Sequence, residues 1–311
     1  LLMHAGEQGR ERERQAAVNV LFKTSRERNA AVEEHYYNLA KEFFGPAAAV
    51  VTHATWWPYP GPSEFKKNGL DWWAAKRDWG QTDEDTPFPV RTALAKKWGG
   101  SVWYNQYYST ESDNYRESLW THALGGGRIN FHPIYPTPHG EDRIARISKL
   151  LAPDIVAGES RIRLLQLITG APIDCPVAVI FGHACAMNWA GPAYDDVGLA
   201  VTDALWQAGY YADLIPSSEI ESGALKIAGD GTLAYGAQHY AAAVLYHPEF
   251  EQPETAVFFN KAAAASTALF RVGGWTRNFS AADFDGIAAL PPAMAECAEA
   301  ADAAAKTVDS L

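Results

Sequence analysis

A run of acidic residues in RDWGQTDEDTPFPV (77–90) is the first group in the sequence that could do chemistry. Asp83, Glu84 and Asp85 lie between an indole, Trp79, and a pair of prolines. Hydrolysis of a glycosidic bond uses two carboxyl groups, one to protonate the leaving oxygen and one to act as base or nucleophile. The acids could instead begin a helix at PFPVRTAL, where carboxylates complement the positive end of the helix dipole. That role explains at most two of them, so Asp83 and Glu84 are candidate catalytic residues.

A second carboxylate is expected after a neighbouring strand, in SVWYNQYYSTES (101–112). The end of that strand carries Asn105 and Gln106 instead. Their amides can hydrogen-bond a sugar hydroxyl but cannot attack as nucleophiles. Glu111 follows several residues later and is the third candidate catalytic residue, with an ordinary loop charge as the alternative.

Aromatic side chains gather in the first half of the chain. Eight of the eleven tryptophans lie between Trp56 and Trp120. An indole can stack on the C–H face of a sugar, although large aromatics also fill protein cores. Histidines at strand ends can bind substrate or be structural, and the charges at 77 and 78 can form an ion pair in the site or lie on the surface. The candidate sugar-binding residues are His53, Trp56, Arg77, Asp78, Trp79, Tyr104, Asn105, Gln106 and His132.

Alternating helices and strands are expected to position these residues. A helix over 9–44 is indicated by apolar residues spaced three or four apart, and Gly45-Pro46 ends it. We predict strands at 47–53, 69–75, 101–109 and 128–136, and helices at 88–100 and 114–127. This alternation predicts a parallel sheet, and ligands of such sheets bind at the carboxyl ends of the strands.

A second unit begins at the buried strand CPVAVIFGH (175–183). Further strands and helices alternate to the C-terminus, and the alanine-rich tail 288–311 is predicted to be one helix. The pattern is that of a small, open, flavodoxin-like parallel sheet. We therefore predict an α/β protein with a barrel-like domain over 1–137, a helical connector over 138–173 and a flavodoxin-like domain over 174–311.

Composition and charge exclude several classes of function. The net charge of −11 and the lack of a long Lys/Arg run argue against a nucleic-acid partner. No apolar run is long enough for a membrane span. The three cysteines are widely spaced and odd in number, which argues against disulfides and a metal site and predicts a cytoplasmic protein, unless a signal peptide precedes the chain. No cofactor is expected, because the flavodoxin-like half lacks the Ser/Thr-rich turn that would hold a flavin phosphate.

The order of the segments VVTHATWWPYP, DWWAAKRDWGQTDEDTPFPVRTALAKKWGGSVWYNQYY and VAVIFG, followed by DALWQAGYYADLIPSSEIESGAL, resembles the family 42 β-galactosidase type of glycoside hydrolases. The resemblance implies a (β/α)8 barrel followed by a flavodoxin-like domain that joins subunits into trimers. A full barrel takes ~250 residues, so it also implies that the front half of the barrel, with the acid/base glutamate, lies before Leu1. The family's nucleophilic glutamate belongs where this chain has VWYNQYY, and the amides there depart from the pattern.

Three functions compete on these grounds. The first is part of a glycosidase that acts on galactoside-like or plant-derived oligosaccharides and forms homo-oligomers. The second is a non-catalytic carbohydrate-binding or scaffold protein, which the amides at 105 and 106 favour. The third is an amidotransferase-like enzyme using the Cys185 thiol near His183, although the glycine elbow of such a nucleophile is missing.

Overall fold

The computed structural model describes residues 9–50, 73, 78, 80–82, 87–99, 102–106, 120, 128–131, 157–158, 160–161, 163–164, 172–184, 196–264 and 266–311. The chain forms two compact units, one made of residues 1–29 with 174–311 and the other of residues 30–173. The domain limits given above, as separately folding parts, stay a prediction. None of the helices in the described ranges is both long and apolar enough to cross a membrane.

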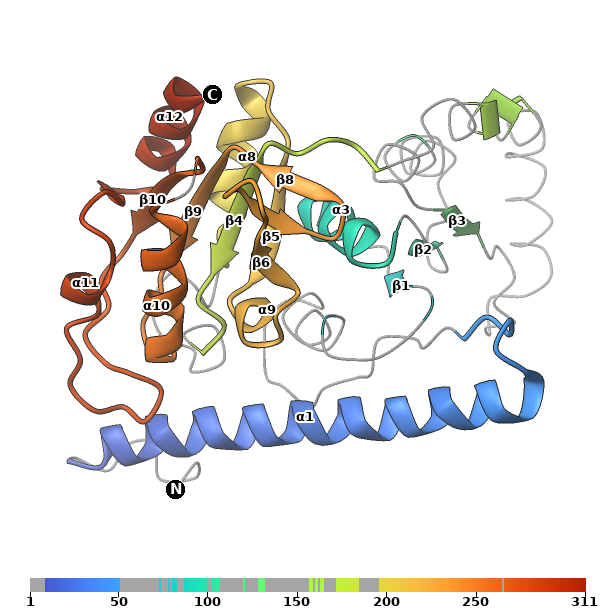
Figure 1. Cartoon of the computed structure of the whole chain (residues 1–311), viewed down its shortest axis with the longest axis horizontal. Helices are drawn as coiled ribbons and strands as arrows, with labels where there is room; N and C mark the ends of the chain where they lie inside the picture. Colours follow the sequence, from blue (N-terminus) through green and yellow to red (C-terminus); the bar gives the residue numbers. More distant parts are fainter. Residues whose placement is uncertain are drawn as a thin grey trace, which may run out of the picture. The chain divides into compact units, whose positions relative to one another are not determined.

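A five-stranded parallel sheet forms the centre of the unit made of residues 1–29 and 174–311 (Figure 1). Its spatial order is β11-β10-β9-β4-β5, which corresponds to the flavodoxin order 2-1-3-4-5 when the strands are numbered along the chain. β4 lies between β5 and β9, with Val177 level with Ala212 of β5 on one side and Ala242 of β9 on the other. The strands are β4 (Val177–Phe181), β5 (Ala212–Pro216), β9 (Ala242–Tyr246), β10 (Ala268–Val272) and β11 (Ala295–Cys297).

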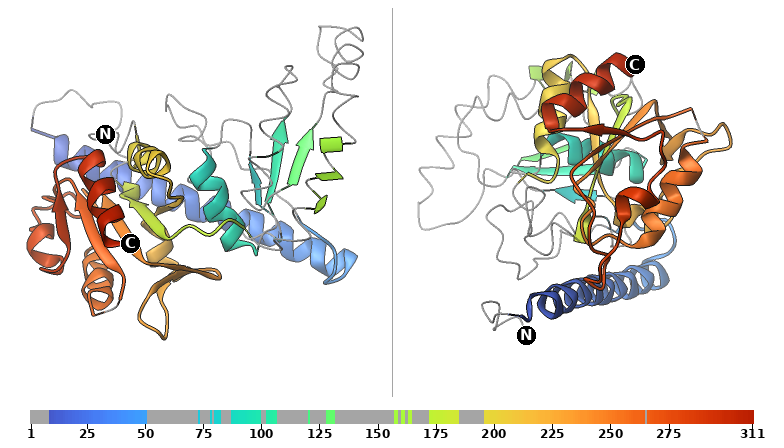
Figure 2. Two further views of the ribbon diagram at one scale, coloured as in Figure 1. Left: turned by 90° about the horizontal axis from the view of Figure 1, so that it is seen from above. Right: turned by 90° about the vertical axis from the view of Figure 1, so that its left-hand side faces the viewer.

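Helices cover both faces of this sheet. α8 (Leu199–Gln207) and α12 (Ala300–Ser310) pack against each other on one face, and α10 (Pro253–Ala262) lies on the other (Figure 2). Every residue of β4 and β9 is buried, as continuous apolar strands of a parallel sheet require when helices cover both faces. The predicted flavodoxin-like sheet is confirmed.

The C-terminal tail differs from the single helix predicted over 288–311. A short helix, α11 (Gly286–Ala289), ends before the Pro291-Pro292 pair, and β11 then adds an edge strand beside β10 before α12 begins. Proline cannot donate a backbone hydrogen bond and clashes with the preceding helical turn, so the pair stops the helix. The alanine-rich composition is typical of α12 alone.

A three-stranded antiparallel sheet and a short helix complete this unit. β6 (Leu225–Ile227), β7 (Leu233–Tyr235) and β8 (Gln238–Tyr240) form consecutive hairpins, and α9 (Ser218–Glu221) connects β5 to β6. A turn at GDGT (229–232) joins β6 to β7, where Ala228 N donates to Thr232 O.

The other unit contains a second parallel sheet, in the order β1-β2-β3. β1 (Gly80–Thr82) is not among the predicted strands, while β2 (Val102–Gln106) and β3 (Arg128–Phe131) confirm predicted strands. α3 (Phe88–Lys97) contacts β1 and β2 and confirms a predicted helix. The expected strand at 69–75 is described only at Trp73, which is buried in a turn, and residues 48–50 of the strand expected at 47–53 are not in a strand.

The long helix predicted at the N-terminus is confirmed as α1 (Glu11–Phe44). Its first turns pack on the unit that contains residues 174–311, where Val18 and Phe22 are buried. Asn19 Nδ2 donates to the backbone oxygen of Phe279 over 2.7 Å, and Gln15 bonds Arg277. These contacts hold the amino-terminal half of the helix close to the loop that follows β10.

Candidate functional site

In the sequence, predicted site residues lie at or directly after the carboxyl ends of β1, β2 and β3. Thr82, the last residue of β1, is level with Tyr104 of β2, and Asn105 is level with Asn130 of β3. Gln106 ends β2 level with Phe131. The acids at 83 and 84 follow β1 directly in the sequence, and the histidine at 132 follows β3. Because parallel strands end at the same edge of a sheet, the last residues of the three strands, Thr82, Gln106 and Phe131, lie at one edge.

Most of the predicted site residues lie outside the described part of the chain. Tyr104, Asn105 and Gln106 are described as backbone positions in β2, and Asp78 is described with its side chain. The others, which stay predictions, are His53, Trp56, Arg77, Trp79, Asp83, Glu84, Glu111 and His132, together with Cys185 of the amidotransferase-like alternative.

Asp78 is a hydrogen-bonding centre within its unit. Its Oδ2 accepts from Lys41 Nζ over 2.6 Å and from Val50 N over 2.9 Å, and its Oδ1 accepts from Tyr37 Oη over 2.9 Å. Partial burial raises the pKa of the Asp78 carboxyl, but these hydrogen bonds outweigh it and leave the pKa below its ordinary value. The Asp78 carboxylate thus connects the end of α1 to the chain that follows, which is a structural role. A contact between Asp78 and substrate stays a prediction.

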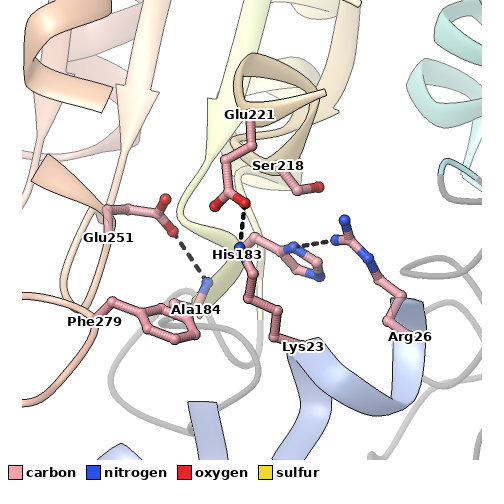
Figure 3. Close-up of a pocket in the computed structure, with 8 residues that line it drawn as sticks. All are labelled: Lys23, Arg26, His183, Ala184, Ser218, Glu221, Glu251 and Phe279. Carbon is pink, nitrogen blue, oxygen red and sulfur yellow. Dashed lines mark hydrogen bonds and ion pairs between the residues drawn. The ribbon is translucent and has the colours of Figure 1, made fainter. Parts of the chain in front are cut away.

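A pocket lies at the carboxyl ends of the strands in the flavodoxin-like sheet. After β4, the chain first adds β5 on one side of it and later adds β9 on the other side. The direction in which strands are added to the sheet therefore reverses between β4 and β9. Open α/β sheets bind ligands at such a switch point. The pocket is lined by Lys23, Arg26, His183, Ala184, Ser218, Glu221, Glu251 and Phe279 (Figure 3).

The backbone after β4 forms the base of this pocket. A Cβ atom on Gly182 would overlap the backbone oxygen of His247, so glycine allows the ends of β4 and β9 to approach closely. His183 N then donates to Ser217 Oγ over 3.0 Å, and Ala184 N donates to Glu251 Oε1 over 3.0 Å. These hydrogen bonds fix the first residues after β4 against the segments that follow β5 and β9.

Glu251 is a buried carboxyl group with an altered acidity. Only 3% of the residue is exposed, and burial raises the pKa of Glu251 to about 7, although hydrogen bonds from Ala184 N and Ser217 favour the ionised form. A carboxyl group with such a pKa is partly protonated near neutral pH. It can therefore accept or donate a hydrogen bond there.

His183 is neutral, and its tautomer follows from its partner. Arg26 Nη1 lies 2.8 Å from His183 Nδ1. A guanidinium only donates, so Nδ1 accepts and the ring proton is on Nε2. Burial, with the nearby charges of Arg26 and Lys23, holds the pKa of His183 well below its ordinary value. The Nε2 atom has no hydrogen-bond partner within the described residues, and neither has Ser218 Oγ.

The side of the pocket formed by α1 carries two basic residues. Lys23 Nζ forms an ion pair with Glu221 Oε2 at 2.6 Å and lies 5.6 Å from the centre of the Phe279 ring. Arg26 is one turn further along the helix and contacts His183, as Figure 3 shows. The cavity volume is about 20 Å³. One water occupies ~10–15 Å³ by this measure, so the pocket accommodates one or two groups of that size.

The backbone around the pocket includes three residues in the left-handed region that are not glycine. They are His247, with φ 48°, Phe250, with φ 67°, and Ala281, with φ 60°. Phe250 and Ala281 pack in one cluster with Ala184 of the pocket. Backbone strain of this kind persists where surrounding structure holds it, and it is concentrated at binding and catalytic sites.

Sequence reasoning identified His183 only as a neighbour of Cys185 and missed the rest of this pocket. The sequence signal that could have indicated the pocket is a short polar segment directly after each of three buried strands: GH after β4, SSE after β5 and HPEFE after β9. The switch point depends on strand order, which the sequence does not display. Within the described ranges, no cluster of His, Cys, Asp and Glu could hold a metal ion.

Comparison with known proteins finds similar solved structures but no match to a family model or a curated sequence. No protein-family model matches the chain, and no curated protein matches it. Among solved structures, the chain is similar to the β-galactosidase from the psychrophilic Marinomonas ef1, with a TM-score of 0.52 and 13% identity over 86% of this chain and 46% of that one. A cold-adapted β-galactosidase from Rahnella sp. R3 gives a TM-score of 0.40 and 13% identity over 67% of this chain and 35% of that one. The chain thus spans less than half of either β-galactosidase. Its fold is distantly β-galactosidase-like, which agrees with the predicted α/β class.

Proposed function

We propose that this chain is part of a glycosidase that binds galactoside-like or plant-derived oligosaccharides at the carboxyl edge of the β1-β2-β3 sheet. The observation that supports the proposal is the strand register: β1, β2 and β3 are parallel and end at one edge. On the proposal, the acids that follow β1 in the sequence, the amides at the end of β2 and the histidine that follows β3 meet at this edge. The fold shared with the Marinomonas ef1 β-galactosidase supports the same reading.

The roles in this proposal follow from side-chain chemistry. Asp83, Glu84 and Glu111 are the candidates for acid, base or nucleophile, because glycoside hydrolysis requires carboxyl groups on both sides of the scissile bond. The amides of Asn105 and Gln106 would hydrogen-bond sugar hydroxyls. Indole rings near the same edge would stack on the sugar.

A non-catalytic carbohydrate-binding protein is the second candidate. The amides at 105 and 106 favour it, because β2 ends in these amides at the position where a glycosidase would carry its second carboxylate. Binding without turnover is then expected.

By its resemblance to family 42 glycosidases, the protein is further proposed to self-associate as a trimer through residues 174–311. Light scattering of the purified protein tests this directly.

Turnover and binding measurements separate these possibilities. The protein is assayed on a panel of nitrophenyl glycosides and titrated calorimetrically with galactose and lactose. The glycosidase proposal expects turnover of the β-galactoside, and substitution of Asp83→Asn with Glu84→Gln should weaken binding or turnover at least about tenfold, or ~1.4 kcal/mol.

Asp302→Asn is the control, because Asp302 is a carboxylate in α12 of the other unit. Binding of sugar without hydrolysis supports the non-catalytic alternative. Failure to bind or hydrolyse any sugar, or an unchanged affinity in the Asp83/Glu84 variant, removes the edge of β1-β2-β3 from the site.

A further inference from the structure

We propose that Asp78 is a positioning residue for the sugar site, because it fixes the start of β1 to the last turns of α1. The inference rests on the proposed function, in which a galactoside binds where β1, β2 and β3 end. Asp78 precedes the opposite end of β1, so it acts on the site through the strand and not by contact with the sugar. All the residues involved belong to the unit of residues 30–173.

Three donors occupy the Asp78 carboxylate. Tyr37 Oη donates to Oδ1 over 2.9 Å, while Lys41 Nζ and Val50 N donate to Oδ2 over 2.6 and 2.9 Å. The backbone adds a fourth hydrogen bond, because Asp78 N donates to Val50 O over 3.0 Å. Hydrogen bonds to an ionised group are stronger than those between neutral groups. We call these four residues the β1 anchor.

Lys41 strengthens the β1 anchor by joining the same segments. Its ammonium also donates to the backbone oxygens of Pro46 over 3.2 Å and Ala48 over 2.5 Å, and it lies 5.1 Å from the centre of the Tyr37 ring. The side chains of Lys41 and Asp78 are 20% and 28% exposed. A partly buried ion pair is screened less by salt than an exposed one, so this pair holds α1 to the residue that precedes β1 by two positions.

The β1 anchor lies at the amino end of the strand, away from the proposed sugar site. Gly80 is the first residue of β1 and Thr82 is the last. A strand advances ~3.3 Å per residue, so these two residues are ~7 Å apart, and Asp78 precedes the first of them. Its carboxylate oxygens are bound by donors from α1 and from Val50. The position and the occupied acceptors therefore favour a role in placing the strand.

The placement of β1 determines where the candidate acids begin. β1 is an edge strand of the described sheet, and three residue pairs join it to β2. A slip by one residue would turn each of its side chains to the other face of the sheet. Consecutive Cα atoms are ~3.8 Å apart, so those of Asp83 and Glu84 lie within ~8 Å of the Thr82 Cα whatever path the chain takes. A displaced β1 would thus displace both acids.

The first measurement needs no sugar. Asp78→Ala should speed hydrogen exchange in peptides that contain residues 80–82 at least about tenfold, because the strand loses its attachment to α1. Asp302→Ala is the matched control. Asp302 Oδ2 also accepts from a lysine and a backbone amide, Lys306 Nζ and Ala298 N, each over 2.8 Å, but it lies in α12 of the other unit. This control should leave the exchange of β1 unchanged.

The second measurement is the affinity for lactose, determined by calorimetry in a double-mutant cycle. Asp78→Ala and Lys41→Met should each weaken binding at least about fivefold, and the double variant should bind little more weakly than the weaker single variant, because both changes break one anchor. A direct contact between Asp78 and the sugar would instead give losses that add. Asp302→Ala should keep the affinity of the unmodified protein.

The outcomes separate this inference from the proposed function. Unchanged exchange of β1 in Asp78→Ala, or additive losses of affinity, would overturn the positioning role and leave the proposed function standing. If the unmodified protein binds no sugar, the proposed function fails and the positioning role fails with it. Urea unfolding verifies that each variant is folded. If Asp78→Ala is not, Asp78→Asn, which keeps an acceptor for Val50 N, replaces it in both measurements.

Discussion

Replacing Glu251 with glutamine should reduce the dependence of stability on pH in the unit formed by residues 1–29 and 174–311. Burial raises the pKa of Glu251 to about 7 in the folded protein, from an ordinary value of 4.5. Between these two values the folded state binds more protons than the unfolded state, so the free energy of unfolding falls as pH rises. The contribution is fully present below pH 4.5 and is lost as pH passes 7.

The magnitude follows from the same two values. The difference between about 7 and 4.5 corresponds to about 3 kcal/mol, at about 1.36 kcal/mol for each pH unit. Most of this change, about 2.5 kcal/mol, falls between pH 5 and pH 8. Glutamine has nearly the same shape, can accept from Ala184 N as the carboxyl does, and does not titrate. The variant should therefore become more stable relative to the unmodified protein as pH rises across this range.

The assay is urea unfolding at pH 5, 6, 7 and 8, with hydrogen exchange of peptides from β4 and β9 to localise the transition. At ~2 kcal/mol per molar urea, the midpoint difference between the two proteins should change by about 1 M from pH 5 to pH 8. Asp302→Asn is the control. A hydrogen bond from Lys306 lowers the pKa of Asp302, which stays ionised throughout this range, so its effect should not vary with pH. Parallel pH profiles for the unmodified protein and Glu251→Gln would refute the reasoning.

Two further predictions concern how the same unit is held together. Gly182→Ala should destabilise it by about 2 kcal/mol or more, because the new methyl group overlaps the backbone oxygen of His247, whereas Gly229→Ala, in open space, should change the urea midpoint little. Tyr240→Phe should lower the free energy of unfolding by about 2–3 kcal/mol, because it removes the 2.7 Å hydrogen bond to the fully buried Asp213. Tyr246→Phe should lower it by about 1 kcal/mol or less, because the hydroxyl of Tyr246 donates to a partly exposed carboxylate. Thermal and urea unfolding measure both variants, and equal effects would contradict the role of burial.

Much of the fold was predictable because its signals are local. The apolar run of β4 is long enough to identify a strand covered on both faces, and the periodicity and glycine stop of α1 define its extent. β1 was not predictable, since three polar residues form a strand only through pairing with β2. The tail shows a local error, because alanine propensity outweighed the Pro291-Pro292 pair in the prediction of one helix.

The pocket at the switch point of the flavodoxin-like sheet could not be predicted from the sequence, because its residues meet through long-range packing. Arg26 and His183 are 157 residues apart, and Ala184 is 67 residues from Glu251. Their proximity depends on the order of the sheet and on where α1 packs. A buried donor without a partner is likewise a property of three-dimensional structure and has no sequence pattern.

Hydrogen exchange with a bound sugar tests the central claim that a galactoside binds at the carboxyl edge of β1, β2 and β3. The protein is exchanged with and without saturating lactose, and peptides are resolved by mass spectrometry. Slower exchange in the peptides that contain Glu84, Asn105 and His132, with unchanged exchange in those from β4 and β9, is the predicted result. Protection confined to the flavodoxin-like sheet, or no protection by any sugar, would contradict the account.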